Sequence, residues 1–184
     1  MVLNQLQIYD QFLKDTDVDR LQKILSRYEL FKKILNVPGD ICECGVFKGT
    51  GIFTWVKLLK LFKPNNDFKV IGFDFFETNR SINFKFQKDK EAFDAHKDNF
   101  ISQQELKNTC LNWGFKNISL HAGNIAETSK AYVSQNIGRR ISLLYLDVDN
   151  YEGTMAALKN LYPIVTKGGV VAFDDYHNHN HGDM

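Results

Sequence analysis

The chain has 184 residues, of which 43% are apolar and 24% are charged, and its formal net charge is +1. This balance fits one globular domain, and the near-neutral charge argues against a nucleic-acid or membrane surface as partner. No secretory signal or membrane-spanning run is visible, and the three cysteines, an odd number without CxxC spacing, are expected to be free thiols. We therefore expect a cytoplasmic protein.

Helices and strands are predicted to alternate along most of the chain. Apolar residues at helical spacing predict a first helix over 18–35. Five strands are predicted at 41–44, 69–73, 118–121, 141–146 and 170–173, with helices at 52–62, 102–113, 129–136 and 151–162. The polar segment 77–100 has no clean period, which indicates a flap or a poorly formed helix. Such alternation is typical of a parallel sheet with helices on both faces and all strand carboxyl ends at one edge.

A glycine-bearing turn, Glu43-Cys-Gly45-Val-Phe-Lys-Gly49-Thr-Gly51, joins the first strand to its helix. Glycines allow the backbone to approach a ligand, and the helix N-terminus offers N–H groups to an anion, but a plain strand-to-helix turn explains them equally well. The spacing is not GxGxxG, which disfavours a dinucleotide site. Asp74 ends the second strand, where an acid can accept both hydroxyls of a ribose or can cap a turn. Together these features favour a ribose-containing ligand.

Acidic residues follow the fourth and fifth predicted strands. If these strands are neighbours, Asp147, Asp174 and Asp175 converge. Their mutual repulsion then favours a divalent cation such as Mg²⁺, which prefers oxygen ligands and keeps water positions for a substrate. The alternative is that strand-end acids cap helices. It suits Asp149, which begins a capping-box-like Asp-Asn-Tyr-Glu pattern, better than Asp174 and Asp175, because no helix is predicted after them.

Three segments, 37–49, 146–154 and 161–176, taken in this order, resemble the class I S-adenosylmethionine-dependent methyltransferases, and among them the macrocin-type sugar O-methyltransferases. The resemblance implies a Rossmann-like three-layer α/β sandwich with a mostly parallel sheet. Residues 1–36 would form an N-terminal helical segment, 37–176 the S-adenosylmethionine-binding domain, and 177–184 a His/Asn-rich tail.

The resemblance also implies a role for each site residue. Six residues would contact S-adenosylmethionine: Glu43, Gly45 and Phe47 at its methionine end, Asp74 at its ribose, and Gly123 and Asn124 beside its adenine. Three would hold Mg²⁺: Asp147, Asp174 and Asp175. Asp149 would be the general base, because Asn150 stands where catechol-type relatives carry a lysine. The implied function is Mg²⁺-dependent methyl transfer to a hydroxyl of a sugar or related small molecule.

The chain departs from the family pattern at its C-terminal end. The family fold has two further strands, whereas this chain ends about ten residues after the fifth predicted strand. The alternative function is therefore a truncated, non-catalytic S-adenosylmethionine-binding domain or a partner subunit. An open edge on the fifth strand also suggests a homo-oligomer. His96 and His121 are expected to be surface and strand-end residues without partners, and the histidines of the tail to be solvated.

Overall fold

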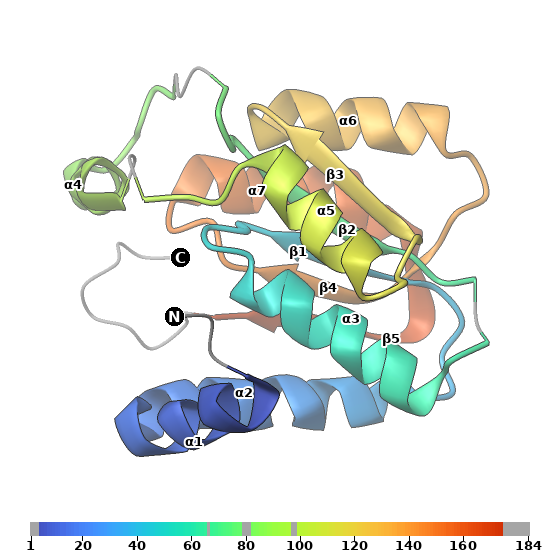
Figure 1. Cartoon of the computed structure of the whole chain (residues 1–184). Helices are drawn as coiled ribbons and strands as arrows, with labels where there is room; N and C mark the ends of the chain where they lie inside the picture. Colours follow the sequence, from blue (N-terminus) through green and yellow to red (C-terminus); the bar gives the residue numbers. More distant parts are fainter. Residues whose placement is uncertain (1–3, 66, 79–81, 97–98, 175–184) are drawn as a thin grey trace.

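The computed structural model describes residues 4–65, 67–78, 82–96 and 99–174 (Figure 1). Its centre is a sheet in the order β3-β2-β1-β4-β5 in which every pair of neighbours is parallel. The strands are β1 (Asp40–Cys44), β2 (Val70–Asp74), β3 (Ile118–Ala122), β4 (Ile141–Leu146) and β5 (Val165–Phe173). The predicted parallel α/β fold is therefore confirmed.

Helices cover both faces of the sheet, as Figure 1 shows. Three lie on one face: α2 (Val18–Lys33), α3 (Thr50–Phe62) and α5 (Gln103–Asn112). Two lie on the other: α6 (Ile125–Gln135) and α7 (Tyr151–Leu161), which is followed by a short 3-10 turn, η1 (Tyr162–Ile164). The three-layer arrangement is confirmed. In the described ranges no helix combines the length and apolar character that crossing a membrane would require.

The core has two parts because side chains alternate across each strand. Phe31 of α2 and Trp55 of α3 pack on one face of the sheet with Ile41. Cys42 and Cys44 point to the opposite face, beneath α6 and α7. Both are buried free thiols, as is Cys110, so the expectation from cysteine spacing is confirmed.

Two further helices lie outside the predicted pattern. The first, α1 (Gln5–Asp15), begins at a capping box in which Asn4 and Gln7 exchange hydrogen bonds, and none of its residues is buried. The second, α4 (Gln87–His96), lies within the segment predicted to be a flap or a poorly formed helix. Asp89 of α4 is buried, and its carboxylate accepts a hydrogen bond from the backbone N–H of Tyr151 at 2.8 Å. The segment therefore docks on the first turn of α7.

The fifth strand begins earlier than predicted. Its pairing with β4 moves from Ile141–Val165 to Leu143–Val170, so the residues between form an irregular bulge. Gly168 lies in this bulge with φ of +88°, a conformation that glycine adopts without steric cost. The sequence prediction started this strand at residue 170, after Gly168 and Gly169, and this boundary is wrong. In the described part of the chain no strand pairs with the outer side of β5.

Candidate active site

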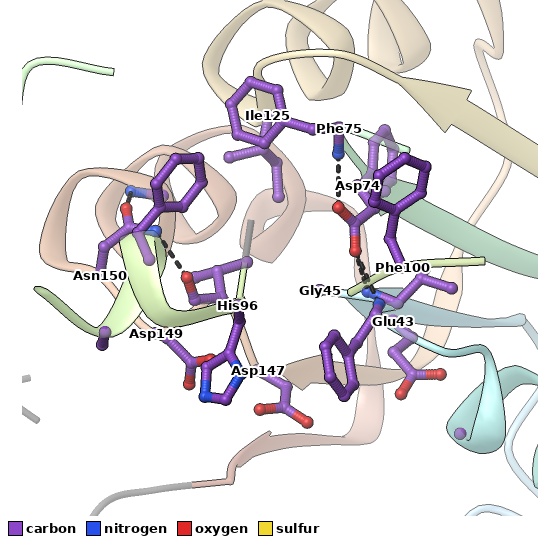
Figure 2. Close-up of a pocket in the computed structure, with 18 of the residues that line it drawn as sticks. Glu43, Gly45, Asp74, Phe75, His96, Phe100, Ile125, Asp147, Asp149 and Asn150 are labelled. Carbon is purple, nitrogen blue, oxygen red and sulfur yellow. Dashed lines mark hydrogen bonds between the residues drawn. The ribbon is translucent and has the colours of Figure 1, made fainter. Parts of the chain in front are cut away.

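A cavity of about 680 Å³ lies at the carboxyl ends of β1, β2 and β4 (Figure 2). Eight of the predicted site residues line it: Glu43, Gly45, Phe47, Asp74, Gly123, Asn124, Asp147 and Asp149. Asp174 lies close by but does not line the cavity, and the predicted metal ligand Asp175 falls outside the described residues. The topology thus brings residues distant in sequence to one place.

Two glycines of the turn after β1 are required by close packing. Gly45 has φ of +90°, and a Cβ there would overlap the backbone carbonyl of Asp147, whose N–H donates to the Cys44 carbonyl at 2.8 Å. Glycine at this position therefore lets the ends of β1 and β4 meet. A Cβ at Gly51 would overlap the carboxylate of Glu43. Gly51 therefore leaves room at the start of α3 for the Glu43 side chain.

Glu43 is a buried acid in the wall of the cavity, with 2% of its surface exposed. Its Oε1 lies 3.5 Å from Nη2 of Arg27, and its Oε2 has no hydrogen-bond partner among the described residues. Burial raises the pKa of Glu43 to about 8, although the Arg27 guanidinium acts in the opposite direction. A buried carboxylate with an unsatisfied oxygen fits a cationic ligand group such as an ammonium.

Asp74 fastens the turn to the sheet. One oxygen of its carboxylate accepts hydrogen bonds from the N–H groups of Val46 and Phe47, each at 2.7 Å. The other accepts from the N–H groups of Phe75 at 2.6 Å and Phe76 at 3.4 Å. The alternative role of Asp74 as a turn cap is therefore present in the structure. Asp74 also lines the cavity, so binding to a ribose is compatible with its position, and this role stays a prediction.

Gly123 and Asn124 connect β3 to α6 at the edge of the cavity. The N–H of Gly123 donates to the Asp74 carbonyl at 2.9 Å, and its φ of +126° suits glycine. Asn124 is the N-cap of α6, where its side-chain oxygen accepts from the N–H of Ala126 at 2.9 Å. This cap fixes the turn before α6, and both residues lie in the cavity wall.

The ends of β4 and β5 are adjacent, as the predicted convergence requires. The N–H of Asp174 donates to the Leu146 carbonyl at 3.0 Å. The Asp174 carboxylate accepts a hydrogen bond from the Tyr145 hydroxyl and pairs with the ammonium of Lys23 at 2.6 Å. Burial alone would raise the pKa of Asp174, but Lys23 and the hydroxyl lower it overall. Two carboxylates of the predicted metal site thus lie near each other, one of them already paired with a cation.

Sequence reasoning missed the cations that face these acids. Lys23 and Arg27, both on α2, line the cavity, and Nη2 of Arg27 lies 3.9 Å from Oδ2 of Asp147. Within the described ranges no group of three or more acidic, histidine or cysteine side chains is arranged to hold a metal ion. The available signal was the spacing of Arg20, Lys23 and Arg27, which places three cations on one side of the helix.

Asn150 caps the helix α7, whereas Asp149, the residue before it, lines the cavity. The N-cap of α7 is Asn150, whose Oδ1 accepts from the N–H of Gly153 at 2.7 Å. The interpretation that Asp149 begins the capping box is therefore wrong by one residue. Asp149 has φ of +54°, a left-handed conformation that Asp and Asn tolerate better than most residues, and it lines the cavity.

The two described histidines lie where expected, His96 exposed and His121 near the end of β3, but both have partners. His96 of α4 lines the cavity (Figure 2). Its ring meets the Phe47 ring edge-on at 5.7 Å, so only the expected lack of a partner is wrong. His121 stacks on Phe73 at 4.8 Å and shares a hydrogen bond with Ser119. The segment around α4 therefore supplies one wall of the cavity.

The family of the chain emerges from comparison with known proteins. A model of the macrocin O-methyltransferase (TylF) family matches residues 16–183. Demethyldecarbamoylnovobiocin O-methyltransferase of Streptomyces niveus is 27% identical over 146 residues, covering 77% of this chain and 54% of that protein. The chain thus spans about half the length of this curated relative.

Solved structures show the same fold. The calicheamicin methyltransferase CalS11 superposes with a TM-score of 0.82 at 26% identity, covering 100% of this chain and 76% of that one. The O-methyltransferase NovP superposes with a TM-score of 0.71 at 24% identity, covering 85% and 65% of the two chains, which supports the fold. Because the family model spans most of the sequence, the chain belongs to the macrocin O-methyltransferase family.

Proposed function

We propose that the chain binds S-adenosylmethionine in this cavity and transfers its methyl group to a hydroxyl of a sugar or related small molecule. One observation carries the proposal: all six residues predicted for the cofactor line a single cavity together with Asp147 and Asp149. Family membership supports the reaction type. CalS11 is described as a TDP-rhamnose 3'-O-methyltransferase, which makes a nucleotide-linked sugar the first acceptor to test.

In the proposed complex the cofactor supplies an electrophilic methyl group on sulfur. Glu43 binds the ammonium of the amino-acid moiety, which fits its burial and its unsatisfied oxygen. Asp74 accepts the ribose hydroxyls, which requires it to release part of its four backbone hydrogen bonds, and Gly123 and Asn124 border the adenine. Ala92, Phe93 and His96 of α4 line the cavity and would limit access of water to the reacting atoms.

Asp149 is the proposed general base. It lies after β4 on the wall of the cavity, and a carboxylate there can take the proton of an acceptor hydroxyl. A correctly placed base contributes about 10²–10⁴-fold to such a reaction. Transfer also requires the hydroxyl oxygen to be about 3–3.5 Å from the methyl carbon, so the cavity must orient the acceptor.

We also propose that Asp147, Asp174 and Asp175 hold Mg²⁺. The chemistry of the donors fits, because carboxylate oxygens are the ligands that Mg²⁺ prefers. The chemistry that a bound Mg²⁺ supplies is a lower pKa of the acceptor hydroxyl. Asp174 accepts the cation only if the Lys23 ammonium leaves it, since the two are 2.6 Å apart in the present structure.

The decisive experiment combines binding with turnover. We expect the purified chain to bind S-adenosylhomocysteine in calorimetry. We also expect it to convert S-adenosylmethionine into S-adenosylhomocysteine when TDP-rhamnose and Mg²⁺ are supplied. Binding without turnover on any sugar acceptor would support the alternative, a non-catalytic cofactor-binding domain. Absence of both binding and turnover would refute the proposal.

A homo-oligomer and a cytoplasmic location complete the proposal. The outer side of β5 offers unpaired backbone groups in the described structure, and native proteins seldom leave such an edge uncovered. Pairing with a second copy would cover it. The molar mass in solution, measured by light scattering, tests this part independently of activity.

A further inference from the structure

A buried guanidinium lies between the two halves of the proposed site. Arg27 of α2 has 7% of its side chain exposed, and its Nη2 is 3.5 Å from Oε1 of Glu43 and 3.9 Å from Oδ2 of Asp147. Glu43 belongs to the cofactor half, and Asp147 to the proposed metal half. One side chain from outside the β-sheet therefore contacts both acids.

Aromatic rings restrict where this guanidinium can lie. Its central carbon is 4.8 Å from the centre of the Tyr145 ring and 5.8 Å from that of Trp55. Arginine packs its plane on aromatic faces while its edge still donates hydrogen bonds. The two rings thus limit the orientations of Arg27 and keep its edge toward the carboxylates.

The hydrogen bonding at this point leaves room for a cationic ligand group. Two acidic side chains face one guanidinium, and the distances exceed the 2.7–2.9 Å or so of a strong charge-assisted hydrogen bond. Glu43 is therefore positioned without being saturated, since its Oε2 has no partner in the described structure. An ammonium group would complete the set.

We propose that Arg27 is a positioning residue that holds the Glu43 carboxylate in place for the ammonium of the cofactor's amino-acid moiety. The inference rests on the proposed function, because it assumes that this moiety lies at Glu43. Arg27 lines the same cavity, but the role proposed for it is exerted through Glu43. Its effect should therefore depend on whether a ligand carries the amino-acid moiety.

Two ligands separate this role from general stabilisation. S-adenosylhomocysteine carries the amino-acid moiety, whereas 5′-methylthioadenosine has the same adenosine and thioether without it. In calorimetric titration of the full chain, Arg27→Met should weaken the affinity for S-adenosylhomocysteine about tenfold or more. The affinity for methylthioadenosine should stay within about twofold of that of the unaltered chain. Arg27→Lys, which keeps the charge but not the planar edge, should lose part of the same preference.

Two controls complete the design. Lys32→Met removes another cation of α2, one that pairs with Glu29 at 2.7 Å, and should change neither affinity. Glu43→Gln should lose the preference for S-adenosylhomocysteine by itself, and adding Arg27→Met to it should have little further effect.

The outcomes distinguish the two levels of the proposal. If the Arg27 variants weaken both ligands equally, or neither, the positioning role is overturned while the proposed function stands. If Arg27→Met does not fold, the ratio of the two affinities in Arg27→Lys decides in the same way. If the unaltered chain binds neither ligand, the proposed function fails and this inference fails with it.

Discussion

Asp149 and Asn150 are neighbours with separable tasks. Asn150→Ala removes the side chain that caps α7 through the N–H of Gly153, so it should lower the free energy of unfolding by about 0.5–2 kcal/mol. Asp149→Asn keeps a residue that tolerates the observed φ of +54°, so stability should change little. If Asp149 is the base, this change should lower kcat by about 10²–10⁴-fold. Urea denaturation and steady-state kinetics of both variants test the division, and an active Asp149→Asn enzyme would contradict it.

Asp147 tests the proposed metal site. Asp147→Ala removes a cavity carboxylate that follows β4, so Mg²⁺-dependent methyl transfer should be abolished while binding of S-adenosylmethionine stays largely intact. The ion pair of Arg27 with Glu43 remains in this variant, which preserves the cofactor half of the site. Calorimetry with cofactor, together with transfer rates over a series of Mg²⁺ concentrations, provides the measurement. Loss of cofactor binding with unchanged metal dependence would show that the assigned role is wrong.

At the scale of residues, the acidic residues of the site could be predicted where they stand at the ends of strands. Asp74 is the last residue of β2 and Asp147 directly follows β4, and parallel strands bring their carboxyl ends to one edge. The facing cations could not be predicted in this way. Lys23 and Asp174 are 151 residues apart in sequence, and only the packing of α2 beside β5 joins them.

At the scale of elements, the strands with uninterrupted apolar runs were predicted well, and β4 has the predicted bounds. The start of β5 was missed because paired glycines are typical of turns as well as of bulges. The segment of α4 could be predicted only as a flap or a poorly formed helix, because its contacts are tertiary: Asp89 and the rings of Phe86 and Phe93 dock it, and no apolar periodicity marks it.

The docking of α4 makes a prediction of its own. Asp89→Ala removes the acceptor for the N–H of Tyr151 at the first turn of α7, where a carboxylate also interacts favourably with the helix dipole. We expect the free energy of unfolding to fall by about 1–2 kcal/mol and the amides near Tyr151 to exchange faster with solvent. Glu91→Gln is the matched control, because Glu91 lies on the same helix, is exposed and contacts Gln87. Equal effects of the two substitutions would argue against the anchor.

At the scale of the whole molecule, the described residues form a parallel sheet with the cavity at one edge, and the chain spans about half the length of the curated relative. The described part forms a two-sided core, with β1 and β4 buried along their whole length. The site is assembled from the ends of these strands, from α2 and from α4. Because the site is built from buried strand ends, its acids also affect the stability of the fold.

Glu43 connects the site to the stability of the fold most directly. Its pKa rises from 4.5 to about 8 because it is buried, so the folded state holds its proton more tightly than the unfolded chain does. The stability that this provides is complete below pH 4.5 and is lost as pH rises through about 8. Each pKa unit corresponds to about 1.4 kcal/mol, so the loss should reach a few kcal/mol.

Glu43→Gln isolates this contribution, since a neutral amide has no proton to lose. In urea denaturation of the ligand-free chain, the unfolding free energy of the unaltered protein should fall relative to that of Glu43→Gln as pH rises from 4.5 to 8. Glu91→Gln, an exposed acid on α4, should run parallel to the unaltered protein across the same window. A constant difference between the unaltered chain and Glu43→Gln would mean that Glu43 is ionised in the folded state throughout. The lowering of the Glu43 pKa by Arg27 would then outweigh its raising by burial. The ligand-free protein would already carry the negative charge that an ammonium ligand needs.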